Sequence, residues 1–155
     1  MIRRTSFILL LALALATAGC NGPSGPSGPP VVVDGPHGGV VVPLSGNAGF
    51  AEILSKEADA DGSRRQGRPP KTVVAYFLGP DKKTALSPVP TGVGVKIVGG
   101  DGATVPLSPA PDSKDLLGAA RFASSAGTLD VGGRRAELSA EIGGSRINLE
   151  FRGLR

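Results

Sequence analysis

Short runs of apolar or alternating residues, separated by glycine, proline, aspartate and serine, fill the chain from Gly39 onward. Runs of this length, bounded by turn-forming residues, are typical of β-strands. The most apolar run, Thr72–Leu78, is rich in β-branched and aromatic residues, which predicts a central strand. The other predicted strands before the C-terminal region are Val40–Leu44, Phe50–Ser55, Thr84–Ser87, Val93–Val98, Thr104–Leu107 and Ala120–Ala123.

The last two runs, Ala136–Ile142 and Ser145–Phe151, alternate apolar and polar residues and are joined by Gly143-Gly144. Two glycines adopt the positive φ angles of a type I′ turn readily, so the pattern predicts a two-residue hairpin. The register then pairs Ala140 with Ile147, Leu138 with Leu149, and Ala136 with Phe151 on one face. On the other face it pairs Glu141 with Arg146, Ser139 with Asn148, and Glu137 with Glu150, with Arg135 and Arg152 diagonally within reach. A slip by one residue would expose the apolar set to water.

Helical periodicity is absent from the long segments, and only Ser113–Ala120 predicts a short helix. About seven to nine short strands over residues 37–153 predict an all-β domain, an antiparallel β-sandwich of immunoglobulin-like type. A small closed barrel is the alternative architecture. The 24 glycines, 14 prolines and absence of tryptophan fit a turn-rich β-domain with one modest core.

Residues 1–19 have the layout of a secretory signal peptide rather than of folded structure. Arg3 and Arg4 provide the positive start, Phe7–Ala16 is apolar, and small residues precede Cys20. A transmembrane helix needs roughly 20 apolar residues, more than this run supplies. The pattern therefore predicts export and cleavage rather than a membrane span.

The sequence Thr17-Ala18-Gly19-Cys20 resembles the lipobox of bacterial lipoproteins, with threonine where leucine is usual. That resemblance implies cleavage before Cys20, a diacylglycerol on its thiol and an acyl chain, such as palmitate, on the new amine. A plain signal peptide with an incidental cysteine is the alternative. Cys20 is the only cysteine in the chain, so it has no intramolecular disulfide partner. Two or three acyl chains would anchor it to a membrane, since each buried methylene contributes about 0.8 kcal/mol.

Residues 20–36 are the predicted tether between this anchor and the domain. Gly22–Pro30 reads Gly-Pro-Ser twice and then Gly-Pro-Pro, which predicts an extended polyproline-type spacer of about 3.1 Å per residue. So few triplets do not form a stable collagen triple helix. Removal of residues 1–19 lowers the formal charge from +4 to +2, too little to indicate a nucleic-acid binder.

Short motifs along the domain are His37-Gly38-Gly39, Phe50–Ile53, Val74–Leu78, Lys83 and Arg121–Ser124. Together with the final glycine-linked hairpin, they make residues 36–152 resemble a family of small, uncharacterised bacterial lipoproteins with an immunoglobulin-like domain. Some members of that family sit near heavy-metal efflux systems and carry more histidines around the first two strands. Val40 and Phe50 occupy those places here.

His37 is the only histidine, which limits the chemistry open to the chain. A metal site needs two or three further ligands, and carboxylates such as Asp34 and Glu52 would complete only a weak one. A Ser-His-Asp triad would have to use His37, but the sequence has no Gly-x-Ser-x-Gly elbow. We therefore expect His37 to shape the entry to the first strand. A metal-binding role is the weaker candidate, and we expect no catalytic residue and no cofactor.

The polar segment from Lys56 to Pro70 predicts a long loop with two partial motifs. Asp59–Ser63 resembles the start of a calcium loop but lacks the distal glutamate. Arg64–Lys71 resembles the core of an AT-hook, which binds A·T minor grooves, yet an exported protein meets no chromosome. We expect a solvated basic loop that contacts anionic lipid head groups or an acidic partner.

The sequence thus predicts a non-enzymatic bacterial lipoprotein, anchored to a membrane through Cys20, with its domain facing the periplasm or the cell exterior. We expect a cell-envelope interaction or structural module whose partner is an envelope protein, not a nucleic acid. The alternative is an accessory ligand- or metal-binding lipoprotein of an envelope transport or efflux system. The single histidine favours the first of these functions.

Overall fold

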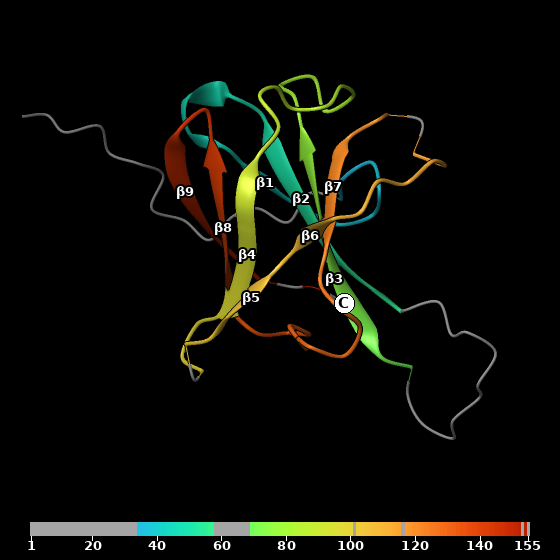
Figure 1. Ribbon diagram of the computed structural model, residues 1–155, viewed down its shortest axis with the longest axis vertical. Helices are drawn as coiled ribbons and strands as arrows, with labels where there is room; N and C mark the ends of the chain where they lie inside the picture. The colour runs from blue at the N-terminus through green and yellow to red at the C-terminus, as the bar shows by residue number, and fades with distance from the viewer. Residues whose placement is uncertain (1–33, 58–68, 101, 116, 153, 155) are drawn as a thin grey trace, which may run out of the picture.

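The computed structural model describes residues 34–57, 69–100, 102–115, 117–152 and 154, which form two antiparallel β-sheets (Figure 1). The strands are β1 (Val40–Pro43), β2 (Phe50–Glu57), β3 (Lys71–Leu78), β4 (Thr91–Ile97), β5 (Thr104–Pro106), β6 (Ser108–Pro109), β7 (Ala120–Ala123), β8 (Ala136–Ile142) and β9 (Ser145–Phe151). A 3-10 turn at Ser45–Asn47 lies between β1 and β2. The strand order is β1-β2-β3-β7-β6 in one sheet and β5-β4-β8-β9 in the other. The predicted all-β fold with two antiparallel sheets is confirmed, whereas its immunoglobulin-like type stays a prediction.

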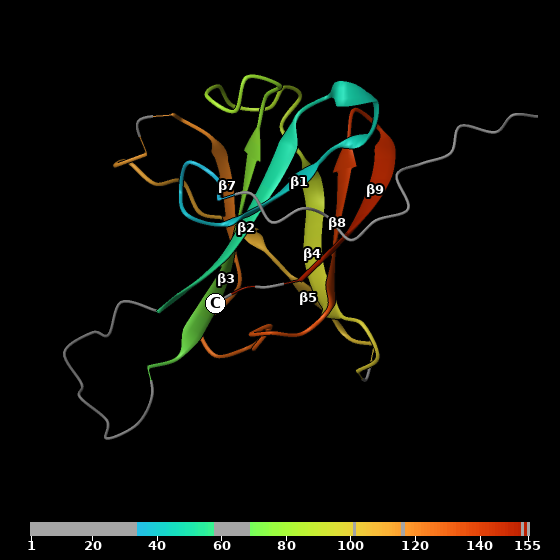
Figure 2. The ribbon, with the colours of Figure 1, turned by 180° about the vertical axis from the view of Figure 1, so that it is seen from behind.

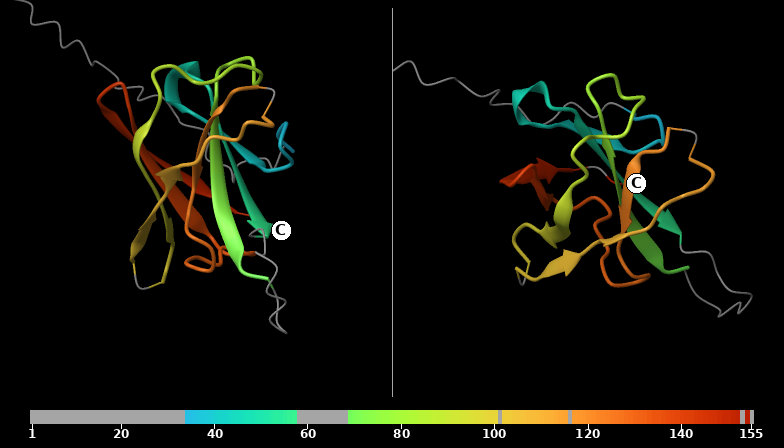
Figure 3. Two further views of the ribbon diagram at one scale, coloured as in Figure 1. Left: turned by 45° about the vertical axis from the view of Figure 1, so that its right-hand side comes forward. Right: turned by 45° about the horizontal axis from the view of Figure 1, so that its top comes forward.

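The two sheets lie face to face and bury their facing sides in one core, as the two layers in Figure 3 show. Alternation along the strands sends Ile53 and Phe77 inward from the five-stranded sheet, and Leu138 and Phe151 from the four-stranded sheet. All four side chains are at most 2% exposed. Burial of large apolar side chains at this depth contributes about 1.5–3 kcal/mol each, so this layer supplies most of the driving force for folding.

The C-terminal hairpin of β8 and β9 has the predicted register at every pair, from Ala136 opposite Phe151 to Ile142 opposite Ser145. Gly143 and Gly144 both have positive φ angles, 57° and 79°, as a type I′ turn requires. The two facing glutamates are each neutralised by a neighbour. Glu150 accepts a hydrogen bond from Arg135 at 3.0 Å, and Glu137 lies 3.0 Å from Lys96 on β4.

The chain passes from one sheet to the other between β5 and β6. The predicted strand Thr104–Leu107 ends one residue early, at Pro106. After Leu107, Ser108 and Pro109 pair with β7 of the five-stranded sheet. Leu107 at the crossing is buried, and its N–H donates to the carbonyl of Val93. Figure 2, the view from behind, shows the five-stranded sheet with β1, β2 and β3 side by side.

The predicted strand Thr84–Ser87 is wrong. Only an isolated bridge between Leu78 and Ala85 forms there. The carboxylate of Asp81 accepts hydrogen bonds from the N–H groups of Lys83 and Thr84 and from the Thr84 hydroxyl, at 2.9–3.0 Å. Local side-chain acceptors of this kind compete with a sheet for backbone donors, so the segment folds as a turn.

The predicted helix at Ser113–Ala120 is also wrong in the described part of that range. Turns replace it: the N–H of Asp115 donates to the carbonyl of Asp112 at 3.0 Å, and that of Gly118 to the carbonyl of Asp115 at 3.1 Å. Gly118 has a φ angle of 60°, which a right-handed helix does not allow. The Asp115 carboxylate captures the N–H groups of Leu117 and Ala119, so the backbone donors of a helix are used locally.

The signal peptide, Cys20, most of the tether, the calcium-like segment and most of the basic loop lie outside the described residues. Strand β2 runs two residues into the predicted loop, to Glu57. At the other end, Leu154 lies just beyond the predicted domain boundary at residue 153 and is buried in the core. No helix within the described ranges is both long and apolar enough to cross a membrane.

Candidate functional site

The outer face of the five-stranded sheet carries a buried polar cluster. Neighbouring strands place Glu52 on β2 opposite Tyr76 on β3, and Tyr76 opposite Arg121 on β7. The inward alternation of Ile53 and Phe77 forces these three side chains onto the opposite face. Glu52 is 0% exposed and Tyr76 is 1% exposed. Burial of a carboxylate this complete requires hydrogen-bond partners.

The partners of Glu52 come from the turn that precedes β1. Its Oε1 atom accepts hydrogen bonds from the N–H groups of His37 and Gly39, both at 2.8 Å. The turn packs so closely that a Cβ atom at Gly35 would overlap the Glu52 carboxylate, and one at Gly39 would lie 2.6 Å from the Ile53 carbonyl oxygen. Glycine at these positions therefore lets backbone N–H groups reach the buried carboxyl group.

The His37 ring lies between two carboxylates. Its Nδ1 atom is 2.7 Å from Oε2 of Glu52, and its Nε2 atom is 3.2 Å from Oδ1 of Asp115. The ring plane stacks on Tyr76, with centroids 3.8 Å apart and an interplanar angle of 2°. The ring is therefore held on both edges by carboxylates and on one face by an aromatic ring.

Asp115 lies in the loop before β7, 78 residues from His37 in the sequence, and closes the cluster from outside. Its side chain is 5% exposed. Burial disfavours the charged form of Asp115, but the N–H of Leu117, the His37 ring and the N–H of Ala119 outweigh it. Together they hold the pKa of the carboxyl below its ordinary value of 3.8. Asp115 is therefore ionised at neutral pH.

Two cationic side chains flank the aromatic ring at the centre. The Nζ atom of Lys56 is 3.3 Å from the Tyr76 hydroxyl, and the Arg121 guanidinium lies 6.0 Å from the ring centroid. Nη1 of Arg121 donates to the carbonyl of Ala110 at 2.6 Å, which ties β7 to the loop. Its Nε atom is buried without a hydrogen-bond partner among the described residues.

Each nitrogen of the His37 ring already has a polar partner. Both ring nitrogens of His37 contact carboxylates, so neither is open to act as a general base or to bind a metal ion. Among the described residues, no group of three or more His, Cys, Asp and Glu side chains is arranged to hold a metal ion. The cluster instead fastens the turn before β1 and the loop before β7 to the sheet. In Figure 1 these are the blue turn and the orange loop beside β7.

A shallow pocket of about 380 Å³ opens over this cluster. Its walls come from the Pro36-His37 turn, from Lys56 and Tyr76 on the sheet, and from the loop that carries Lys114 and Asp115. The mixture of two lysines and two aspartates gives it no dominant charge. The His37 side chain lines the pocket but is only 14% exposed.

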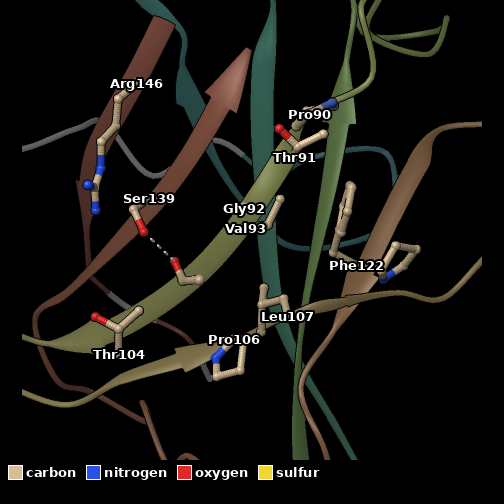
Figure 4. A pocket seen from close by; sticks show the side chains of 12 residues that line it. Pro90, Thr91, Gly92, Val93, Thr104, Pro106, Leu107, Phe122, Ser139 and Arg146 are labelled. Carbon is tan, nitrogen blue, oxygen red and sulfur yellow. Dashed lines mark hydrogen bonds between the residues drawn. The ribbon is translucent and has the colours of Figure 1, made fainter. Parts of the chain in front are cut away.

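A larger hollow of about 660 Å³ lies beside β4 and β5 and reaches Phe122 on β7 (Figure 4). Glycine, proline and aliphatic side chains form most of its wall, and Arg146 is its only charged side chain. The hydroxyl of Ser139 donates to the carbonyl of Gly94 at 3.3 Å, the dashed line in Figure 4. Nothing in this hollow combines a nucleophile with a base.

The structure brings together His37 and Glu52, two of the three residues that the sequence suggested for a weak metal site. Asp34, the third, forms a backbone bridge with Val40. Sequence reasoning missed Asp115 and Tyr76. A charged residue at the centre of the apolar run Phe50–Leu54 was the available signal for a buried carboxylate. No signal in the sequence linked it to a residue in the distant loop. Cys20 lies outside the described residues.

Comparisons with models of protein families, with curated proteins and with solved structures gave no match to this chain. The resemblance to small bacterial lipoproteins therefore rests on the short sequence motifs alone.

Proposed function

We propose that this chain is a membrane-anchored lipoprotein of the bacterial cell envelope, with a β-sandwich that acts as a non-catalytic interaction or structural module. The anchor rests on the lipobox-like sequence before Cys20, the only cysteine. The non-catalytic role is supported by one observation above all: both nitrogens of the only histidine contact carboxylates, at 2.7 and 3.2 Å. A ring held in this way contributes to the fold rather than to a reaction.

Metabolic labelling with palmitate tests the anchor. We expect the wild-type chain to take up label, to partition with membranes and to lose residues 1–19. The variant Cys20→Ser replaces the thiol with a hydroxyl of similar size that cannot form the thioether, so it should take up no label. An unlabelled wild-type chain that stays in the soluble fraction would refute the anchor.

Cross-linking in intact envelopes tests the interaction role. The tether would hold the domain a few tens of ångströms from the bilayer, at about 3.1 Å per extended residue. A partner in the envelope should therefore be captured by the wild-type chain and much less by Cys20→Ser, which would not be held at the membrane. Equal capture by both variants would remove the support for a tethered module.

The alternative function, an accessory metal- or ligand-binding lipoprotein of a transport system, is favoured only by the pocket of about 380 Å³ beside His37. Titration of Cu(II) or Zn(II) into the wild-type chain and into His37→Ala separates the two functions. We expect weak binding that does not change with the substitution. A large loss of affinity in His37→Ala would favour the alternative, provided that thermal unfolding shows the variant to be folded.

A further inference from the structure

The four strands at the sheet edges differ in how well they are protected from pairing with another strand. Three of them are short and contain proline: β1 with Pro43, β5 with Pro106 and β6 with Pro109, at four, three and two residues. Short strands and prolines are common devices against edge pairing. Strand β9 has seven residues, no proline and no register shift against β8.

The outer edge of β9 presents a regular row of backbone groups. In a two-residue hairpin the residues that flank the turn exchange hydrogen bonds, so the odd-numbered residues of β9 bond to β8. The N–H and C=O groups of Arg146, Asn148 and Glu150 then point away from the sheet. Within the part of the chain that the structure describes, β9 pairs with β8 alone and ends its sheet, the dark red strand in Figure 1.

The side chains of the same three residues are exposed on the outer face of the sheet. Their order along the strand is cation, amide, anion. A second copy of β9, antiparallel and centred on Asn148, would place Arg146 opposite Glu150 twice and Asn148 opposite itself. Opposite charges that face each other across strands stabilise the pair. Arg135 of the same chain contacts only Oε2 of Glu150, so Oε1 is left for Arg146 of the second copy. The sequence of this edge is therefore complementary to itself.

We propose that β9 is a self-association edge, through which two copies of this chain join their four-stranded sheets into one antiparallel sheet. The register centred on Asn148 also uses the outward-pointing backbone groups of both copies. On the core side it sets the half-buried Ile147 of one copy beside Leu149 of the other. This inference concerns the chain itself and does not depend on the lipid anchor.

Neighbouring registers that use the same backbone groups lack the two opposite-charge pairs, and most of them set like charges opposite each other. A shift that centres the pair on Arg146 sets two arginines opposite each other, and one that centres it on Glu150 sets two glutamates opposite each other. A half-way shift toward the C-terminus sets Arg146 against Arg152, and one toward the N-terminus sets Arg146 against Asn148, which gains no opposite-charge pair. Like charges directly opposite destabilise an antiparallel pair, so the register centred on Asn148 is the one that the charges select.

Disulfide trapping tests the register directly. The full chain with Cys20→Ser has no other thiol, so Asn148→Cys adds a single one at the centre of the pair. Facing residues lie about 5.5 Å apart at Cα, within the range of about 4.4–6.8 Å for a disulfide. The matched control is Ser145→Cys, because two copies of Ser145 would lie about 20 Å apart in this register. We expect covalent dimer from Asn148→Cys under mild oxidation and little from the control.

Charge exchange tests the pairing without a covalent bond. In sedimentation experiments at low salt, Arg146→Glu alone and Glu150→Arg alone should each weaken the dimer about tenfold or more, because each creates two like-charge pairs. In a mixture of the two variants, the two glutamates on the β9 edge of one chain face the two arginines on that of the other. The mixture should therefore form heterodimers at least as well as the parent chain forms homodimers. Formation of these heterodimers would also show that neither variant has lost its fold.

Two results would overturn the proposal. Equal trapping of Asn148→Cys and Ser145→Cys would mean that the copies do not meet in this register. A mixture of the charge variants that stays as monomeric as its components would mean that the charges on β9 repel partners rather than select one, the protective role that charged edges have in other proteins. Neither result bears on palmitate labelling of Cys20, so the anchor is judged separately.

Discussion

The two faces of the five-stranded sheet are both buried, but different forces hold them. The inner face packs Ile53, Ala75 and Phe77 against the second sheet with no polar side chain among them. The outer face sets Glu52 and Tyr76, also almost fully buried, under a turn and a loop. Apolar burial is non-directional and tolerates small shifts. The charged cluster depends on each partner being present and in place.

This difference explains why β3 reads as an almost unbroken apolar run. Val73, Ala75 and Phe77 face the core, while Val74 and Tyr76 join Leu54 in a smaller cluster on the outer face. A strand buried on both sides loses the alternation of a half-exposed strand. The inner face then sets the stability of the domain, whereas the outer face fixes where the turn before β1 and the loop before β7 lie.

Truncation of a side chain on the inner face should cause the largest loss of stability. Phe77 is fully buried and meets Phe122 edge-to-face, with ring centroids 5.7 Å apart. We expect Phe77→Ala to lower the free energy of unfolding by about 3–5 kcal/mol, from lost burial and the cavity left behind. Urea unfolding followed by circular dichroism measures this loss, which should not depend on pH. A loss below about 1 kcal/mol would mean that the core collapses around the cavity.

Replacement of the buried Glu52 carboxyl group on the outer face should lower the free energy of unfolding somewhat less. Glu52→Gln keeps the shape and leaves one oxygen for the N–H groups of His37 and Gly39, but it removes the carboxylate oxygen that contacts Nδ1 of His37. We expect a loss of about 2–3 kcal/mol in the same unfolding experiment. The imidazole nitrogen shifts of His37 should also change, because Nδ1 then faces an amide. The matched control is Glu57→Gln at the exposed end of the same strand, which should be nearly neutral.

Acid should affect the stability contributed by the outer face but not that contributed by the inner face, because only the outer face carries a titratable group such as Asp115. The folded state lowers the pKa of Asp115, so its stabilising contribution is complete above the ordinary value of 3.8 and is lost as pH falls through the lower folded pKa. At neutral pH we expect Asp115→Asn to lower the free energy of unfolding by about 1–2 kcal/mol. As pH falls below 3.8 the difference should shrink, and the wild-type chain and the variant should converge once pH lies below the folded pKa of Asp115.

Asp81 needs its own control in that titration. The N–H groups of Lys83 and Thr84 hold the pKa of this exposed carboxyl below its ordinary value as well, so it titrates in the same acid range. Asp81→Asn should therefore flatten part of the acid dependence without touching the outer-face cluster. If Asp115→Asn leaves the acid dependence of the unfolding free energy unchanged, the cluster does not stabilise the fold through that carboxylate.

The parts of the molecule that the sequence predicts well are those whose partners are close in the chain. The register of β8 and β9 follows from a two-residue turn and strict alternation, so local information decides it. Local sequence does not predict the order of β2, β3 and β7 in the sheet. Their connections are long, and no turn geometry fixes which residues meet across them.

The candidate site could not be predicted in full, because its residues come from distant parts of the chain. The contact between His37 and Glu52 spans 15 residues and follows once β1 and β2 pair. The contact between His37 and Asp115 spans 78 residues and joins two loops, which hydrophobic periodicity does not place. The failed helix at Ser113–Ala120 has the same cause, since the Asp115 carboxylate takes the backbone donors that a helix would use.

The smallest expected effect tests which part of Tyr76 matters on the outer face. Its hydroxyl has one partner among the described residues, Lys56 at 3.3 Å, whereas its ring stacks on His37 at 3.8 Å. We expect Tyr76→Phe to change the free energy of unfolding by no more than about 0.5 kcal/mol, because a long hydrogen bond to an exposed lysine contributes little net free energy. Tyr76→Leu removes the stacked ring and should cost about 1 kcal/mol more than Tyr76→Phe. Equal losses in the two variants would mean that the His37 ring is held by its carboxylates alone, and that the aromatic surface beneath it only fills space.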